Sequence, residues 1–249
     1  MTTQNVMQKI WNLINWHKNQ APVNAPPEPQ EWLDVTEDST VSDNEKWRAC
    51  QHDITYGVSQ HESTENTVLL HVNHPAGQWI AEVFAYWFPE EKRVSLNENL
   101  KIIADIKPIR EILTKNCLLN LYIEFWGTIT PPQGTDGCDM FELMFIFRSA
   151  KTDDVTNQIP LDGFWNQITE HWYYVAKHTH NLPMDTFGHV EVSLDELKER
   201  LVEVYGVDLG CCKISEIHLG IETSGGKGEM KAAFRNVALQ KKTVQVDAA

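Results

Sequence analysis

The sequence lacks any apolar run of about 18 residues, the shortest length expected of a helix that crosses a membrane. It is also poor in basic residues: 21 Lys and Arg stand against 35 Asp and Glu, giving a formal net charge of −14. Nucleic acids and anionic membrane surfaces select for basic patches, so this charge argues against both as partners. Neutral ligands, such as sugars, fit the composition better.

Cysteines are few. Cys50, Cys117, Cys138, Cys211 and Cys212 match neither a disulfide framework nor a zinc pattern, since the only close spacing is the adjacent pair. We therefore expect thiols in a reducing compartment. The N-terminus lacks the basic segment and unbroken apolar segment of a secretory signal, so the expectation is a soluble, unexported protein, cytoplasmic by default.

Several catalytic and cofactor motifs are missing as well. There is no G-x-S-x-G, the signature of a serine nucleophile elbow. The stretch SGGKG at 224–228 does not meet the phosphate-loop pattern, and a hairpin turn explains it. The pairs His71/His74 and His178/His180 have no acidic or cysteine partner at ligand spacing. We expect no metal and no cofactor.

The first 45 residues differ from the rest of the chain. Val6, Ile10 and Leu13 recur at helical spacing, which predicts a short amphipathic helix. Four prolines between residues 22 and 29 then predict an extended linker. We predict a domain boundary near residue 45, with residues 1–45 as a helical appendage that docks to another surface and residues 46–249 as the main domain.

Beyond residue 45, apolar and polar residues alternate in segments rich in β-branched and aromatic residues, the pattern of β-strands. Turn signals such as PPQGTDG separate them. The predicted strands cover residues 53–60, 66–74, 78–88, 117–129, 140–149, 170–179, 187–193, 216–222 and 230–241. Many strands without βαβ alternation predict an all-β fold, a two-sheet antiparallel β-sandwich of the concanavalin-like jelly-roll type.

One helix interrupts the strands. Ser193 followed by Glu196 reads as a capping box, leucines then recur at helical spacing, and Gly206 is placed to end the helix. A second short helical piece is predicted within residues 106–116.

The stretch CDMFELMFIFRSA, residues 138–150, carries a lone glutamate in an apolar run. Alternate side chains of a strand share a face, so Glu142 lies with Met144 and Ile146. Phe141, Leu143, Phe145 and Phe147 point the other way and are predicted to be sandwich core. Glu142 is therefore expected on the outer surface of its sheet, in a concave cleft if the sheet is curved.

Two other predicted strands repeat this arrangement. Glu124 shares a face with Tyr122 and Trp126, and Glu222 shares one with Gly220 just before a glycine-rich turn. Two carboxylates facing each other across a sugar are the apparatus of glycoside hydrolysis. For each glutamate taken singly, a place on a solvated sheet face is the competing interpretation.

MFELMFIF resembles the nucleophile strand of glycoside hydrolase family 12, the jelly-roll endoglucanases and xyloglucanases. IHLGIETSGGKGEMKAAFRNVAL resembles that family's acid/base segment, and NLYIEFWG takes the place of the strand with its auxiliary Asp. The resemblance extends over about residues 80–240, with the motifs in the family's order. It implies a retaining, endo-acting hydrolase of β-1,4-glucan or xyloglucan, with Glu142 as nucleophile, Glu222 as acid/base and Glu124 as auxiliary carboxylate.

Side chains near these glutamates are predicted to contact the sugar: Trp126, Met144, Tyr122, Trp87 and Trp172, with Trp79 a further stacking candidate. Ile146 stands where the family has Trp, and Glu124 where it has Asp. Both differences favour the alternative, a non-catalytic carbohydrate-binding (lectin-like) sandwich. A polysaccharide lyase is a third option, but the acidic composition argues against an anionic substrate. The resembled family is usually secreted, in contrast to the compartment expected from the N-terminus.

Overall fold

The computed structural model describes residues 31–37, 40–41, 43, 45–52, 58–64, 66–74, 80–130, 139–152, 163–169 and 171–243. The predicted N-terminal helix, its proline-rich linker and Trp79 lie outside these residues. Residues 33–242 form one compact unit, which carries the site and the core described below. The domain boundary near residue 45 stays a prediction.

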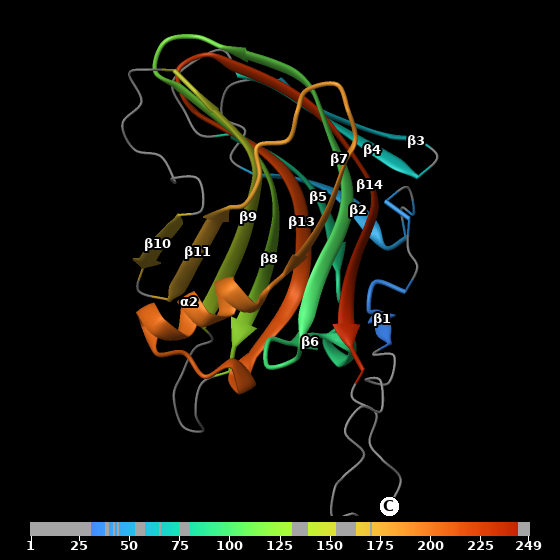
Figure 1. The fold of residues 1–249 in the computed structure, drawn as a ribbon, viewed down its shortest axis with the longest axis vertical. Helices are drawn as coiled ribbons and strands as arrows, with labels where there is room; N and C mark the ends of the chain where they lie inside the picture. Colours follow the sequence, from blue (N-terminus) through green and yellow to red (C-terminus); the bar gives the residue numbers. More distant parts are fainter. Residues whose placement is uncertain are drawn as a thin grey trace, which may run out of the picture. The chain divides into compact units, whose positions relative to one another are not determined.

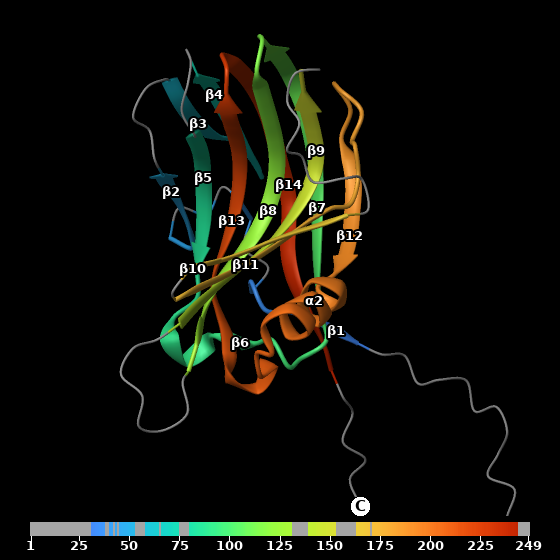
Figure 2. The ribbon, with the colours of Figure 1, turned by 90° about the vertical axis from the view of Figure 1, so that its left-hand side faces the viewer.

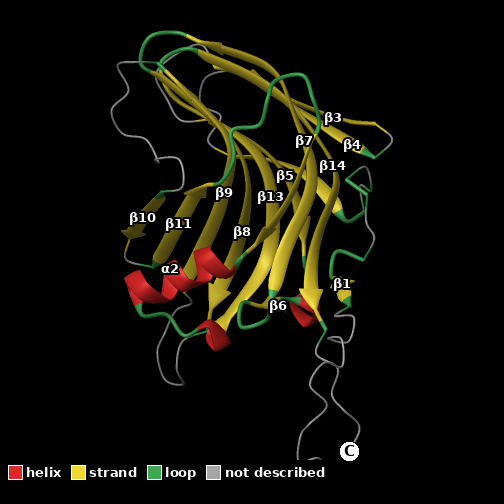
Figure 3. Ribbon diagram, in the orientation of Figure 1, coloured by secondary structure: helices red, strands yellow, loops and turns green. Residues whose placement is uncertain are grey.

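The described strands form two sheets (Figures 1 and 3). The six-stranded sheet runs in the order β12 (Gly188–Ser193), β7 (Leu100–Leu113), β14 (Gly228–Lys242), β4 (Thr67–His74) and β3 (Val58–Thr64), with β1 (Trp32–Asp34) also on β14. The eight-stranded sheet runs β10 (Phe164–Thr169), β11 (Trp172–His178), β9 (Asp139–Lys151), β8 (Cys117–Ile129), β13 (Cys212–Gly225), β5 (Ile80–Trp87) and β2 (Trp47–His52), with β6 (Val94–Ser95) on β13.

Side chains from the two sheets meet in one core. Phe141, Leu143, Phe145 and Phe147 of β9 are at most 1 % exposed, as the alternation predicts. The predicted two-sheet sandwich is therefore confirmed. It departs from a purely antiparallel arrangement at one of the described pairs, because β9 and β11 run parallel. The strand between them in sequence, β10, pairs antiparallel with β11 at the end of the sheet order.

The predicted helical piece at 106–116 is wrong. Leu100–Leu113 is one long strand, β7, whose alternate residues Leu100, Ile102, Ala104 and Ile106 are fully buried. Pro108 lies within it and has no backbone N–H to donate. The neighbouring strand β14 shifts its register at this point, between Lys231 and Ala232, so the ladder bends around the proline. Strand β7 was absent from the predicted set, as were β10 and the shorter strands β1, β2 and β6.

The helix predicted around residues 193–206 is confirmed as α2 (Asp195–Tyr205), but its start differs from a capping box. Leu194 is the N-cap residue, the Ser193 hydroxyl accepts from the Asp195 N–H, and Glu196 pairs with Lys177 of β11 instead. Gly206 ends the helix with a left-handed φ of 68°, its N–H donating to the Val202 carbonyl.

Helix α2 also supports β11. The Tyr205 hydroxyl donates to the Tyr174 carbonyl at 3.0 Å, and the Tyr205 ring meets that of Tyr173 edge-on at 5.2 Å. These contacts fix the strand that brings Tyr174 and Trp172 to the outer face of the eight-stranded sheet. Figure 2 shows β10 and β11 turned relative to β5 and β13, so this sheet is strongly twisted.

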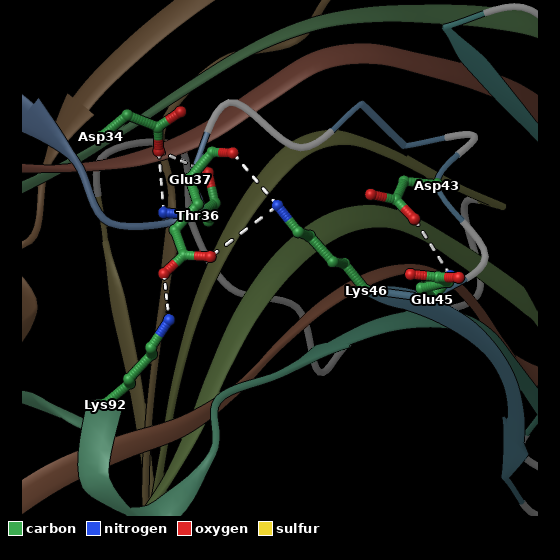
Figure 4. Close-up of polar contacts among 7 residues, drawn as sticks. All are labelled: Asp34, Thr36, Glu37, Asp43, Glu45, Lys46 and Lys92. Carbon is green, nitrogen blue, oxygen red and sulfur yellow. Dashed lines mark hydrogen bonds and ion pairs between the residues drawn. The ribbon is translucent and has the colours of Figure 1, made fainter.

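Polar contacts tie the segment between β1 and β2 to the short 3-10 turn η1 (Glu90–Lys92), as Figure 4 shows. The Glu37 carboxylate pairs with Lys92 and, at 3.8 Å, with Lys46. Thr36 is buried, and its N–H donates to Asp34 Oδ1 at 2.8 Å. The exposed ion pairs are screened by water, so the buried Thr36 contributes more to holding the segment.

Candidate functional site

The site lies on the outer face of the eight-stranded sheet, where strand register sets the neighbours. Tyr174 of β11 is opposite Glu142 of β9, and Glu142 is opposite Trp126 of β8. Trp126 in turn is opposite Glu216 of β13, and Glu216 is opposite Trp87 of β5. Five strands thus bring two carboxylates and three aromatic rings into one row.

The next row brings Glu124 beside Glu142. Glu124 is opposite Met144 of β9 on one side and His218 of β13 on the other. Glu124 and Glu142 are 3 % and 5 % exposed, and a hydrogen bond joins their carboxyls. Two buried carboxyls can form such a bond only when one of them holds a proton, and the bond raises the pKa of Glu142.

Burial raises the pKa of Glu142 well above its ordinary value, since the anion loses its hydration. The charge of Glu124, the hydrogen bond to it and the charge of Glu222 raise the pKa further. A hydrogen bond from the Trp172 side chain acts in the opposite direction and favours the anion. Glu142 therefore takes up a proton at a pH at which a solvated glutamate is ionised.

Glu222 approaches from farther along β13. It lies six residues beyond Glu216, the residue in the row of Glu142, and is half-buried. Its charge nevertheless raises the pKa of Glu142, of Tyr122 and of Tyr174. The structure thus gathers the three sequence-predicted carboxylates, from three strands, around one region of this face.

Two tyrosines lie near the three carboxyls: Tyr122, which is 2 % exposed, and Tyr174, which is half-buried. A Cβ built on Gly220 would lie 2.1 Å from the ring of Tyr122, so this ring covers Gly220 and only glycine fits beneath it. The Tyr174 hydroxyl contacts Met144 Sδ at 3.3 Å. Burial raises the pKa of both tyrosines well above the ordinary value, which keeps both hydroxyls protonated as donors.

The predicted sugar-contacting residues fall into two groups. Trp87 and Trp172 are 41 % and 37 % exposed, and Trp126 is half-buried, with its ring 5.0 Å from that of Trp172. Tyr122 and Met144 are each 2 % exposed. The indoles thus present surface to solvent, whereas the side chains of Tyr122 and Met144 are buried.

Ile146, in the place of the family's tryptophan, is 1 % exposed. It belongs to a small apolar cluster on this outer face, separate from the main core: Val83, Ala85, Tyr122, Met144, Ile146 and Ala176. A small buried apolar cluster therefore occupies the position where the resemblance predicts a stacking surface.

Sequence reasoning missed His218. Its Nδ1 lies 3.0 Å from Glu124 Oε1 and its Nε2 lies 2.8 Å from Glu216 Oε2, while its ring stacks on Trp126 at 5.2 Å. Burial alone would lower the pKa of His218, but the hydrogen bonds and charges of both glutamates outweigh it and raise the pKa to about 9. Tyr174 was missed as well. Counting in steps of two, from Glu222 through Gly220 for His218 and from Trp172 for Tyr174, would have placed both on this face.

Within the described ranges, no group of three or more His, Cys, Asp or Glu side chains is arranged to hold a metal ion. In the same part of the chain, no helix has the length and apolarity needed to cross a membrane.

No family model and no curated protein matches this sequence. Solved structures do match the fold. A family 12 xyloglucanase from Bacillus licheniformis is 10 % identical with a TM-score of 0.54, over 80 % of this chain and 94 % of that one. The endoglucanase Cel12A of Rhodothermus marinus is 11 % identical with a TM-score of 0.52, over 86 % and 97 %.

A family 11 xylanase from Neocallimastix patriciarum is 12 % identical with a TM-score of 0.51, over 85 % of this chain and 99 % of that one. At such identities the similarity concerns the fold. The chain has the jelly-roll fold of these glycoside hydrolases, as the resemblance to family 12 implies.

Proposed function

We propose that this chain is a retaining, endo-acting glycoside hydrolase of a β-linked glucan, a β-1,4-glucan or a xyloglucan. The observation that carries the proposal is the group of Glu142, Glu124 and Glu222, in which the Glu124 carboxyl bonds to that of Glu142 and the charges of Glu124 and Glu222 both raise the pKa of Glu142. Burying carboxyls together is unfavourable for folding, and perturbed carboxyls gathered at one place are typical of catalytic sites.

In the first step, a carboxylate oxygen of Glu142 attacks the anomeric carbon and the bond to the glycosidic oxygen breaks. Glu222 gives its proton to that departing oxygen. In the second step, Glu222 takes a proton from water, whose oxygen attacks the anomeric carbon and releases Glu142 with retained configuration. This mechanism requires the two carboxyl groups to approach within roughly 5–5.5 Å around the bound sugar.

Glu124 acts through its hydrogen bond to Glu142. As Glu142 attacks, the shared proton moves to Glu124, so that the attacking oxygen is ionised. When the glycosyl bond to Glu142 breaks, the proton is again shared. One proton held between two carboxyls thus lets Glu142 act as a nucleophile although its pKa is raised.

The exposed indoles of Trp87 and Trp172 support a neutral glucan as substrate, because sugar rings stack on aromatic faces. In the sheet order, β8 with Trp126 lies between β5 with Trp87 and β11 with Trp172, so the indoles extend across the strands instead of along one strand. Such an arrangement suits several consecutive sugar units. The solved structures similar in fold include a protein described as a xyloglucanase and another described as an endoglucanase.

The test measures reducing ends released from a panel of β-glucans by the native chain, Glu142→Gln and Glu222→Gln. Glu191→Gln is the matched control, since Glu191 is exposed on β12 of the other sheet and pairs with Lys101. We expect hydrolysis by the native chain and the control, and none by the two site variants.

Two outcomes contradict the proposal. Hydrolysis that survives both site substitutions removes the catalytic assignment. Binding of glucan by a native chain that hydrolyses none of the panel selects the alternative function, a non-catalytic carbohydrate-binding sandwich.

A further inference from the structure

A buried histidine lies beside the proposed catalytic pair and has no role in the mechanism above. His218 is fully buried, and its two ring nitrogens face two different carboxylates, Glu124 at 3.0 Å and Glu216 at 2.8 Å. A neutral imidazole donates from one nitrogen only, whereas an imidazolium donates from both. Contacts to two carboxylates therefore fit the charged form.

Two indole rings and three more distant charged side chains also surround His218. Trp126 of β8 stacks on the ring at 5.2 Å with an interplanar angle of 25°, and Trp87 of β5 lies at 6.3 Å. Aromatic faces favour a nearby cation. Glu142 of β9 lies beyond Glu124, Glu222 of the same strand lies beyond Gly220, and Arg48 of β2 holds the register position beyond Ala85. The surroundings of the ring are predominantly acidic and aromatic.

We propose that His218 is a positioning residue whose imidazolium, held between Glu124 and Glu216, keeps the Glu124–Glu142 pair at one shared proton. Without a cation, two buried carboxyls next to Glu222 would each take up a proton, and neither could be ionised for attack. The inference rests on the proposed function, because the pair contains the proposed nucleophile. Glu216 is the outer anchor that holds the ring in the charged form, with its side chain 20 % exposed.

The first experiment reads the charge of the ring directly. In protein labelled with 15N at histidine, the nitrogens of His218 should give imidazolium shifts at pH 7, and the ring should lose its proton near pH 9. His218→Gln assigns the signal by its disappearance. A neutral His218 ring at pH 7 overturns the proposal.

The second experiment is the pH profile of kcat/KM on a β-glucan. His218→Gln should move the acidic limb upward by about one to two pH units, a loss of about tenfold or more on that limb. His189→Gln is the control, since His189 is exposed on the six-stranded sheet and bonds to Asp105 at 2.8 Å. An acidic limb that is the same in native protein and His218→Gln overturns the proposal.

Glu216→Gln serves as a milder variant in case His218→Gln does not fold. It leaves the ring in place and removes the outer carboxylate, so the pKa of His218 should fall and the acidic limb should move upward by a smaller amount. An unchanged His218 titration in Glu216→Gln contradicts the role given to Glu216.

A third measurement separates this inference from the proposed function. Titration of 13C-labelled glutamate carboxyls needs no substrate. If the native chain hydrolyses nothing, the proposed function fails, yet His218→Gln should still raise the pH at which the Glu124–Glu142 pair takes up its second proton. Carboxyl titrations that are identical with and without His218 overturn the inference.

Discussion

Carboxylates on the outer faces of the two sheets have opposite surroundings. On the six-stranded sheet, Asp105 accepts from His189 at 2.8 Å and from Asn236 at 2.7 Å, and Arg235 pairs with it at 3.3 Å. On the eight-stranded sheet, the neighbour of Glu142 is another buried carboxyl, Glu124, whose charge and hydrogen bond raise the pKa of Glu142.

The pKa values follow this difference. Partial burial alone would raise the pKa of Asp105, but hydrogen bonds from His189, Asn236 and Arg235 outweigh it and hold the pKa below its ordinary value. Burial and neighbouring carboxyls raise that of Glu142. The first face stabilises its anions, as a solvated surface does. The second gathers acids where ionisation is unfavourable, which weakens folding and is typical of a place that carries chemistry.

The largest expected effect is on kcat, which should fall on substitution at the site face and stay nearly constant on substitution at the outer face of the six-stranded sheet. Glu142→Gln should lower kcat on a β-glucan by about 10⁴-fold or more, because the nucleophile is gone. Asp105→Asn should leave kcat within about twofold, since it removes only surface contacts on the opposite sheet. Steady-state rates of both variants, with circular dichroism to establish folding, test the contrast. Equal losses of kcat in the two variants would contradict the contrast between the faces.

The next effect concerns packing on the site face. Gly220→Ala should lower the free energy of unfolding by about 1–3 kcal/mol, because the new Cβ overlaps the Tyr122 ring. The same change in a Tyr122→Ala background should have a much smaller effect, since the obstructing ring is absent. Urea unfolding of the four proteins gives the coupling. A full loss in both backgrounds would show that Tyr122 is not the obstacle.

The pH dependence of stability should have opposite signs on the two faces. Below the unfolded pKa of Glu142, near 4.5, both states hold the proton. As pH rises, the unfolded chain ionises first, so the native protein loses stability until its own pKa is passed. Glu142→Gln should remove that loss, giving a variant more stable than the native protein above pH 5.

Asp105 should act in the other direction. Its pKa is lowered, so its contribution is complete above about pH 4 and is lost as the pH falls through the folded value. Asp105→Asn should destabilise the protein at neutral pH and flatten its acid limb. Chemical unfolding from pH 3 to pH 9 measures both variants, and parallel curves for the two would contradict the comparison.

The smallest expected effect is on substrate binding. Trp87→Ala should raise KM by about two- to tenfold, the range for loss of one stacking contact, with little change in kcat. Ile168→Ala, at a 59 % exposed position on β10, should leave both constants unchanged. A fall in kcat with constant KM in Trp87→Ala would place this ring next to the reacting atoms instead of along the bound chain.

Much of the fold could be predicted because strand periodicity is local. The alternation in 140–149 assigned Phe141 and Phe145 to the core and Glu142 to the opposite face, and Gly206 ended its helix as expected. Strand β7 was missed because the segment around Pro108 and its charged neighbours favours a helix when taken alone. The alternation that begins at Leu100 is the strand signal in this region. The parallel pairing of β9 with β11 has no local signal.

For the site as well, some features follow from a single strand and others only from the arrangement of the strands. The sequence by itself determined which side chains share a face, since period two follows from the backbone geometry of a single extended strand. Only the tertiary structure decided which strands are neighbours, and so that Glu124 lies between Glu142 and His218. Strand order depends on contacts between distant segments, which the entropy of loop closure and burial of the whole core settle together. The charges that govern Glu142 therefore come from partners that its own strand could not reveal.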